Sequence, residues 1–123
     1  MKKVKEVCVN HCNDLYLKFE EHRKKMLFRN SNRKNCLKIQ VDGCVITDGE
    51  RCDNLLKVDT NEGAEYYVEL KGTDVGHALE QIDKTIQTLH DDNSPVFAYV
   101  IPTNQNPADT TKEQQFRARL KKK

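Results

Sequence analysis

The stretch CDNLLKVDTNEGAEYYVELKG, residues 52–72, decides the fold of this 123-residue chain. Residues 52–58 are typical of a strand whose apolar side chains are Leu55 and Leu56, and residues 66–71 are rich in residues that favour strands. Between them Asn61 and Gly63 indicate a turn. The stretch therefore predicts two antiparallel strands joined as a hairpin.

The hairpin brings three ionisable residues to one face of the sheet. Glu69 and Lys71 share a face because side chains alternate along a strand. A turn centred on Glu62 places Asp53 opposite Lys71, and a turn centred on Asn61 places Asp53 opposite Glu69. Opposed Cβ atoms lie ~5 Å apart. With either centre, two carboxylates and one ammonium converge on a small patch.

Two carboxylates this close repel each other unless a cation lies between them. A hard ion such as Mg²⁺ or Mn²⁺ prefers oxygen ligands, which Asp53, Glu69 and the backbone carbonyl of Leu70 would supply. Lys71 would then orient or help to deprotonate an attacking water. The alternative is a surface hairpin with an ordinary Glu–Lys ladder, since the bare pattern is common in charged proteins.

Two elements follow the hairpin. Residues 75–90 have apolar side chains at helical spacing, and residues 96–101 form a short apolar run typical of a buried strand. A helix between two strands predicts a crossover that places strands 66–71 and 96–101 parallel.

Before the hairpin, residues 13–30 have apolar positions near helical spacing, and residues 36–41 alternate as a strand. After residue 101, a last helix is expected to begin at Thr110 or Thr111. The expected fold is α/β: a three-layer sandwich with a mixed central sheet flanked by helices, in the order αβββαβ. We expect one domain over residues 1–123, with a core over about 13–101 and a basic C-terminal helix or tail over 108–123.

At these residues the sequence resembles the PD-(D/E)xK nuclease superfamily, the restriction-endonuclease-like fold shared by many restriction endonucleases, junction resolvases and recombination exonucleases. The matching segments are CDNLL (residues 52–56), VELKG (68–72) and ALEQI (78–82). The family Pro before the first carboxylate is absent, and Cys52 stands there instead. The resemblance implies a Mg²⁺-dependent deoxyribonuclease, with endo- or exonuclease action left open.

The resemblance assigns catalytic roles to Asp53, Glu69, Lys71 and Gln81. Gln81 would contact substrate phosphate or a metal-bound water, and the alternative is a polar residue at the edge of the helix stripe. Many members carry a helical Glu that reaches the metal through water. Glu20 or Glu21 of the expected first helix is the candidate for that position, with Glu20 preferred, and the alternative is a solvated carboxylate.

Charge is distributed unevenly along the chain. Residues 1–38 carry 11 Lys/Arg against 4 Asp/Glu, residues 39–111 carry 4 against 14, and residues 112–123 carry 6 against 1. Basic ends suit a phosphate backbone and an acidic middle suits divalent cations. We therefore expect DNA to bind through basic residues near 23–38 and 117–123, and the alternative is that these are solvated surfaces.

The five cysteines match neither a disulfide framework nor a zinc ribbon, so free thiols in a reducing cytoplasm are expected. No apolar run approaches the ~20 residues that span a membrane.

Two rival functions stay open: a catalytically inactive nuclease-fold module that binds nucleic acid or a protein partner, and a subunit of a larger nuclease or defence complex. A double-strand cut would favour a homodimer, because one such centre cuts one strand.

Overall fold

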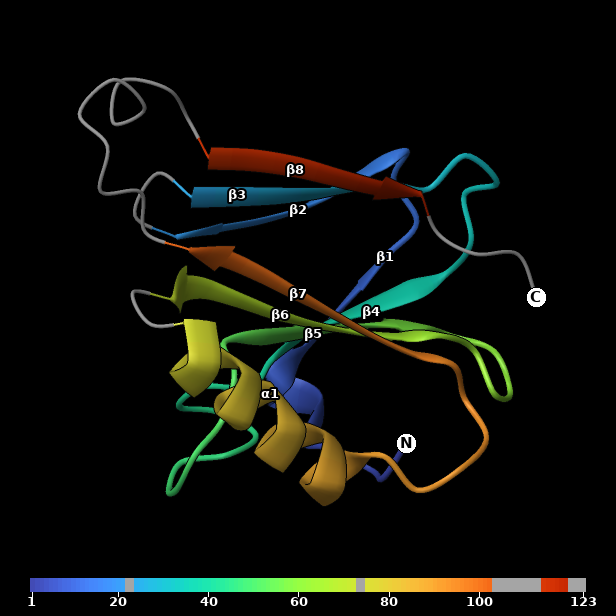
Figure 1. Ribbon diagram of the computed structural model, residues 1–123. Helices are drawn as coiled ribbons and strands as arrows, with labels where there is room; N and C mark the ends of the chain where they lie inside the picture. Colours follow the sequence, from blue (N-terminus) through green and yellow to red (C-terminus); the bar gives the residue numbers. More distant parts are fainter. Residues whose placement is uncertain (22–23, 73–74, 103–113, 120–123) are drawn as a thin grey trace.

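The computed structural model describes residues 1–21, 24–72, 75–102 and 114–119 (Figure 1). Within these ranges the chain forms two β-sheets, one α-helix and a short 3₁₀ helix. In chain order the elements are η1 (Glu6–Cys8), β1 (Val9–Cys12), β2 (Tyr16–Glu21), β3 (Lys24–Arg29), β4 (Cys36–Gln40), β5 (Asn54–Val58), β6 (Glu65–Gly72), α1 (Val75–Leu89), β7 (Val96–Pro102) and β8 (Gln114–Arg119).

The larger sheet has five strands in the order β1-β4-β5-β6-β7. The first four pair antiparallel, whereas β6 and β7 pair parallel. Parallel neighbours need a crossover connection, and α1 supplies it. The predicted hairpin, crossover helix and mixed sheet are therefore confirmed, and the protein is of the α/β class.

Helix α1 covers one face of the larger sheet (Figure 1). Ile82 and Leu89 pack there against buried side chains of the sheet, including Leu55 and Tyr67. Because strand side chains alternate between faces, Tyr67 points to the helix while its neighbours Tyr66 and Val68 point away from it.

The other face is covered by a three-stranded sheet in the order β2-β3-β8, where helices were expected. The predicted helix over residues 13–30 is wrong. Leu17 and Phe19 in β2, and Met26 and Phe28 in β3, are buried at a spacing of two, which is the period of a strand. The same segment also places Leu15 and Phe19 four residues apart, which fits one face of a helix.

The predicted C-terminal helix is also wrong where the structure describes it. Residues 114–119 form β8, which pairs parallel with β3, Met26 standing opposite Phe116 and Arg29 opposite Arg119. Thr110, Thr111 and the terminal lysines lie outside the described residues.

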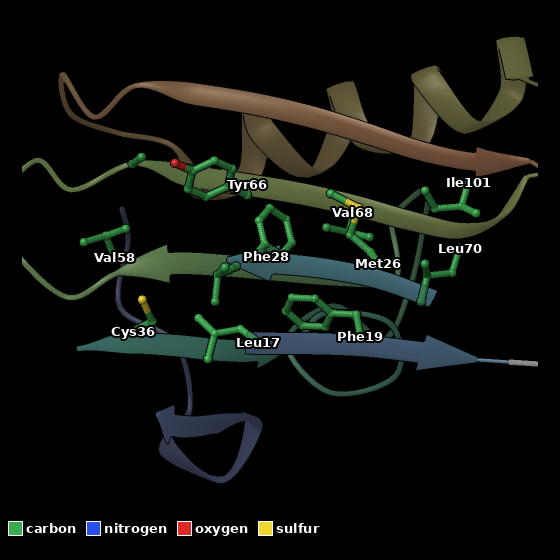
Figure 2. Close-up of a cluster of buried hydrophobic side chains, with 12 residues drawn as sticks. Leu17, Phe19, Met26, Phe28, Cys36, Val58, Tyr66, Val68, Leu70 and Ile101 are labelled. Carbon is green, nitrogen blue, oxygen red and sulfur yellow. The ribbon is translucent and has the colours of Figure 1, made fainter. Parts of the chain in front are cut away.

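The main hydrophobic core lies between the two sheets (Figure 2). Phe28 of the small sheet is its centre, with its ring edge-on to Tyr66 at 5.1 Å and to Tyr99 at 5.7 Å between centroids. Tyr66 also stacks on Phe97 at 5.0 Å. Edge-to-face and offset-stacked rings are the favoured aromatic geometries, so this cluster fixes how the sheets sit on each other.

In the described part of the chain, no helix is long and apolar enough to cross a membrane.

Candidate functional site

Asp53 and Glu69 lie side by side where β5 meets β6. The observed pairs Asn54–Val68 and Leu55–Tyr67 keep a constant sum of residue numbers, so the next pair is Asp53 with Glu69. Of the two turn centres that the sequence allowed, the one at Asn61 is therefore confirmed. Asp53 is 7% exposed and Glu69 is 4% exposed. Two carboxylates thus lie next to each other in a largely buried position.

Backbone amides hold both carboxylates in place. The Asp53 amide donates to Glu69 Oε1 at 3.1 Å, and the Leu70 amide donates to Asp53 Oδ2 at 2.8 Å. The Asp53 side chain therefore binds the backbone of β6, and the Glu69 side chain binds the backbone directly before β5. Each carboxylate thus has a backbone hydrogen-bond donor for one of its oxygens, which offsets part of the cost of burying these polar groups.

The backbone around Asp53 is held from two further directions. Its carbonyl accepts from the amide of Val41 at 3.0 Å and from that of Asp42 at 3.2 Å. On the helix side, the Cys52 amide donates to the buried Thr85 hydroxyl at 2.9 Å. Asp53 is therefore placed by the residues that follow β4, by β6 and by α1 together.

Gln81 also attaches the segment before Asp53 to α1. The side-chain amide of Gln81 donates to the Arg51 carbonyl at 3.1 Å, and the backbone carbonyl of Gln81 accepts from the Thr85 hydroxyl at 2.8 Å. The structure thus places Gln81 next to the segment that leads into Asp53. A contact with substrate, which the sequence predicts, stays a prediction.

Burial raises the pKa of the Cys52 thiol to about 12, and the nearby Glu69 and Asp53 charges add to the effect, while the Thr85 hydroxyl opposes it. Cys52 is fully buried. A thiol with such a high pKa is a poor nucleophile at neutral pH, so Cys52 is a packing residue beside the carboxylates.

A pocket of about 270 Å³ opens beside Asp53. Four of the residues that line it are acidic: Glu20, Glu21, Asp42 and Asp53. Glu20 reaches it from strand β2, where the sequence predicted a helix. Carboxylate oxygens are the ligands that hard divalent ions use in proteins, but no three acidic residues of this pocket have their ligand atoms within 4.8 Å of one another in the described part of the chain.

Three cationic neighbours partly neutralise the rim of this pocket. Glu20 pairs with Lys18 at 3.2 Å and with Lys25 at 3.7 Å, and Arg51 pairs with Asp42 at 2.8 Å. The rim charges are thus shared with partially exposed cations. Asp53 lies deeper and is held by backbone amides.

Leu70 and Lys71 occupy an irregular part of β6. The register with β7 shifts between Glu69 and Gly72. The side chain of Leu70 lies in the core beside Ile101 (Figure 2), and its amide contacts Asp53. A metal contact from the Leu70 carbonyl stays a prediction. The Lys71 backbone belongs to β6, and its side chain lies outside the described part of the structure.

A second group of ionisable residues lies at the opposite end of β6. Ligand atoms of Glu65, His90 and Asp92 are within 4.8 Å of one another. Glu65 is fully buried, accepts a hydrogen bond from the Tyr67 hydroxyl at 2.7 Å and has Lys57 Nζ at 4.0 Å. The three groups have the donor set for a divalent ion, but Lys57 already supplies Glu65 with a cation from within the fold.

The cysteines differ from the sequence prediction of free thiols. Cys8 and Cys44 form a disulfide, with their Cα atoms 5.7 Å apart. It ties η1 to the turn after β4. Cys12, Cys36 and Cys52 are free. The pairing had no signal in the sequence, because 36 positions separate the two residues.

Comparisons with protein-family models, with curated proteins and with solved structures find no significant match for this chain.

Proposed function

We propose that this protein is a metal-dependent nuclease that hydrolyses phosphodiester bonds in DNA. The observation that supports it most directly is the buried Asp53–Glu69 pair, of which Asp53 lines an acidic pocket. Two adjacent carboxylates held rigidly by backbone amides are preorganised to share a cation. The donor set is made of hard oxygens, so it fits Mg²⁺ or Mn²⁺.

The arrangement of strands also supports the proposal. The order β4-β5-β6-α1-β7, with an antiparallel meander followed by a parallel crossover, is the βββαβ part of the order that the PD-(D/E)xK resemblance implies. Asp53 directly precedes β5 and Glu69 lies in β6, as that resemblance requires. The layer that covers the sheet opposite α1 differs, since strands stand where a helix was expected.

In the proposed reaction, water attacks the phosphorus atom, an O–P bond forms, and the P–O bond to the leaving sugar oxygen breaks. Asp53 and Glu69 would hold Mg²⁺ or Mn²⁺, which lowers the pKa of a bound water and polarises the phosphate. Lys71 would orient the attacking water as an ammonium or take up its proton as a neutral amine, and the departing sugar oxygen would take a proton from solvent water. Gln81 and Thr85 would act indirectly, because they position the backbone that carries Asp53.

Basic residues near 23–38 and 117–123 would contact the DNA backbone without reading its sequence. Within this set, β3 contributes Lys24, Lys25 and Arg29, and residues 117–119 belong to β8, which pairs with β3. The register brings these two basic segments together in the small sheet, although they are far apart in the sequence. A homodimer would allow a double-strand cut.

The decisive experiment is a cleavage panel of linear, circular, single-stranded and branched DNA and of RNA, each with Mg²⁺, Mn²⁺ or EDTA. We expect DNA cleavage that EDTA abolishes. Glu69→Gln, which keeps an oxygen to accept from the Asp53 amide, and Lys71→Ala should each abolish it while the fold survives. Glu80→Gln on the exposed side of α1 is the charge-matched control and should cleave normally. Unchanged cleavage in both site variants would refute the proposal.

One observation favours a second candidate, a nuclease-fold module that binds without cutting. One carboxylate oxygen of Asp53 and one of Glu69 already serve a backbone amide, which is also what a purely structural pair would do. Calorimetry with Mg²⁺ separates the two, because a structural pair has no need to bind the ion. Heat of binding that disappears in Asp53→Asn supports the nuclease, and its absence from the unmodified protein supports the binding module.

A further inference from the structure

A second groove continues from the acidic pocket and has a different chemistry. It has a volume of about 330 Å³ and lies between β2 of the small sheet and β1 and β4 of the larger one. Glu20, Gln40 and Asn54 line both spaces, so the two are adjoining parts of one surface depression. A ligand held at the Asp53 end can therefore extend into the second groove.

The lining of the second groove offers amides and cations. Asn10, Gln40 and Asn54 provide three carboxamides; the Gln40 amide already donates to the Asp42 carbonyl at 3.2 Å, which leaves its second N–H and its oxygen for a ligand. Lys18 and Lys38 provide positive charge. This combination matches a nucleotide, because carboxamides pair with the edges of bases and lysines bind phosphate.

Lys38 is held in a defined position in this groove. Its ammonium lies 5.2 Å from the centroid of the Phe19 ring, and Phe19 is buried in the core between the sheets. A cation over an aromatic face is attracted by the ring quadrupole. Lys18 differs, because it pairs with Glu20 at 3.2 Å. Lys38 is therefore the better preorganised phosphate ligand of the two.

The spacing suits successive phosphates of one strand. Val41 binds the Asp53 carbonyl, and Lys38 precedes Val41 by three residues, which is about 10 Å of extended chain. Stacked nucleotides rise ~3.4 Å each, so about three stacked nucleotides, or fewer in an extended strand, bridge that length. A strand whose phosphate is bound at the Asp53 end thus brings another of its phosphates, at most about three nucleotides away, within reach of Lys38.

We propose that this groove is a subsite for one unpaired nucleotide next to the scissile phosphate, and that the substrate is a single-stranded nucleic acid or an unpaired end. The inference rests on the proposed function, because that function places the scissile phosphate beside Asp53 and the neighbouring nucleotide in the groove. The groove volume is at the lower end of the roughly 300–1,000 Å³ of ligand pockets, which suits one nucleoside unit. Stacked base pairs of a duplex do not present a single base to three carboxamides.

The test measures binding separately from cleavage. Fluorescence anisotropy in EDTA follows a labelled single-stranded DNA oligonucleotide, the same sequence as RNA, and its blunt duplex. We expect the unmodified protein to prefer the single strands. Lys38→Gln should reduce the slope of log K against log salt by about 0.7, the effect of one lost phosphate contact on a single strand. Lys84→Gln, which removes the same charge from the exposed side of α1, should leave the slope unchanged.

Asn10→Ala tests the base contact, because Asn10 is exposed and its loss should not affect folding. We expect it to weaken binding about three- to tenfold for some homopolymers and not for others, as loss of a base-edge hydrogen bond would. Equal weakening for every homopolymer, or a blunt duplex that binds as tightly as the single strand, would overturn the subsite.

The two proposals can fail independently. Lys38-dependent binding of single strands without metal-dependent cleavage would retain the subsite and reject the nuclease. Cleavage whose KM is unchanged in Lys38→Gln and Asn10→Ala would retain the nuclease and reject the subsite.

Discussion

Glu69 accepts a hydrogen bond from the backbone amide of Asp53 at 3.1 Å, across the β5–β6 pair. The next amide along β6, that of Leu70, donates in return to Asp53 Oδ2 at 2.8 Å. This reciprocal arrangement makes the pair part of the sheet, so its geometry is set before any ligand arrives. Preorganisation of this kind lowers the cost of bringing charged ligands together.

We expect Asp53→Asn to lower Mg²⁺ affinity by at least about 100-fold, because even the residues that orient metal ligands are worth 10–100-fold. The variant keeps a side-chain oxygen that can accept from the Leu70 amide, so the fold should be retained. Calorimetry measures the affinity and circular dichroism checks the fold. Unchanged Mg²⁺ binding would show that the ion, if bound, lies elsewhere, for example at Glu65, His90 and Asp92.

Thr85 is expected to stabilise the site through its hydroxyl rather than its volume. Thr85→Val keeps the size but leaves the buried Cys52 amide without its acceptor, which costs about 1–3 kcal/mol of unfolding free energy. Thr85→Ser keeps the hydroxyl and loses one methyl group, at about 0.8 kcal/mol. Urea unfolding compares the two variants. A valine variant at least as stable as the serine variant would contradict this role.

Breaking the Cys8–Cys44 disulfide should destabilise the protein by about 2–4 kcal/mol, because the cross-link restricts a long loop of the unfolded chain. Cys44→Ser measures this in denaturant. Cys12→Ser, at a cysteine that is free in the structure, is the control and should show a much smaller effect. Equal stability of the Cys44→Ser variant and the unmodified protein would mean that the bond does not form in solution.

Stability should fall at alkaline pH because of Cys36. Burial raises the pKa of this thiol to about 12, with the nearby Cys12 adding to the effect. Below the ordinary thiol pKa near 9, the group is protonated in both the folded and the unfolded states, so its contribution is fully present. Between pH 9 and about 12 only the unfolded chain releases the proton, and stability is lost as pH rises.

Cys36→Ala is the matched variant for this effect. It should be less stable at neutral pH, because it leaves a small cavity in the core, yet its stability should decline less steeply above pH 9. Denaturant midpoints across the alkaline range measure both slopes. Parallel curves for the variant and the unmodified protein would exclude Cys36 as the cause.

The local pattern of apolar residues was sufficient to predict the β5–β6 hairpin, the helix α1 and the parallel strand β7. These elements are consecutive in the chain, and their periods of two and 3.6 residues are distinct. The position of Asp53 beside Glu69 followed from the same hairpin, because antiparallel pairing fixes which residues stand opposite each other once the turn is placed. The sequence left two turn centres open, and the Asn61 centre is the one that the fold adopts.

The local pattern of apolar residues gave the wrong element for residues 13–30 and for residues 114–119, where strands stand in place of the predicted helices. Leu15, Phe19, Met26 and Leu27 fit a helical face nearly as well as Leu17, Phe19, Met26 and Phe28 fit a strand face. The strand conformation is favoured because it buries these side chains against Tyr66 and Val68 of the larger sheet. Both residues lie far from residues 13–30 in the sequence. Strand β8 depends on β3, which lies far away in the sequence, so its identity is set by a non-local pairing.

The residue pattern along the chain was thus enough to predict the hairpin, the crossover and the shared face of Asp53 and Glu69, because each depends on neighbours along the chain. Tertiary structure alone decided the second sheet, the Cys8–Cys44 bond, the attachment of Arg51 and Cys52 by Gln81 and Thr85, and the approach of Glu20 to the Asp53 pocket. Those contacts join segments that only long-range packing brings together, and side-chain spacing carries no information about them.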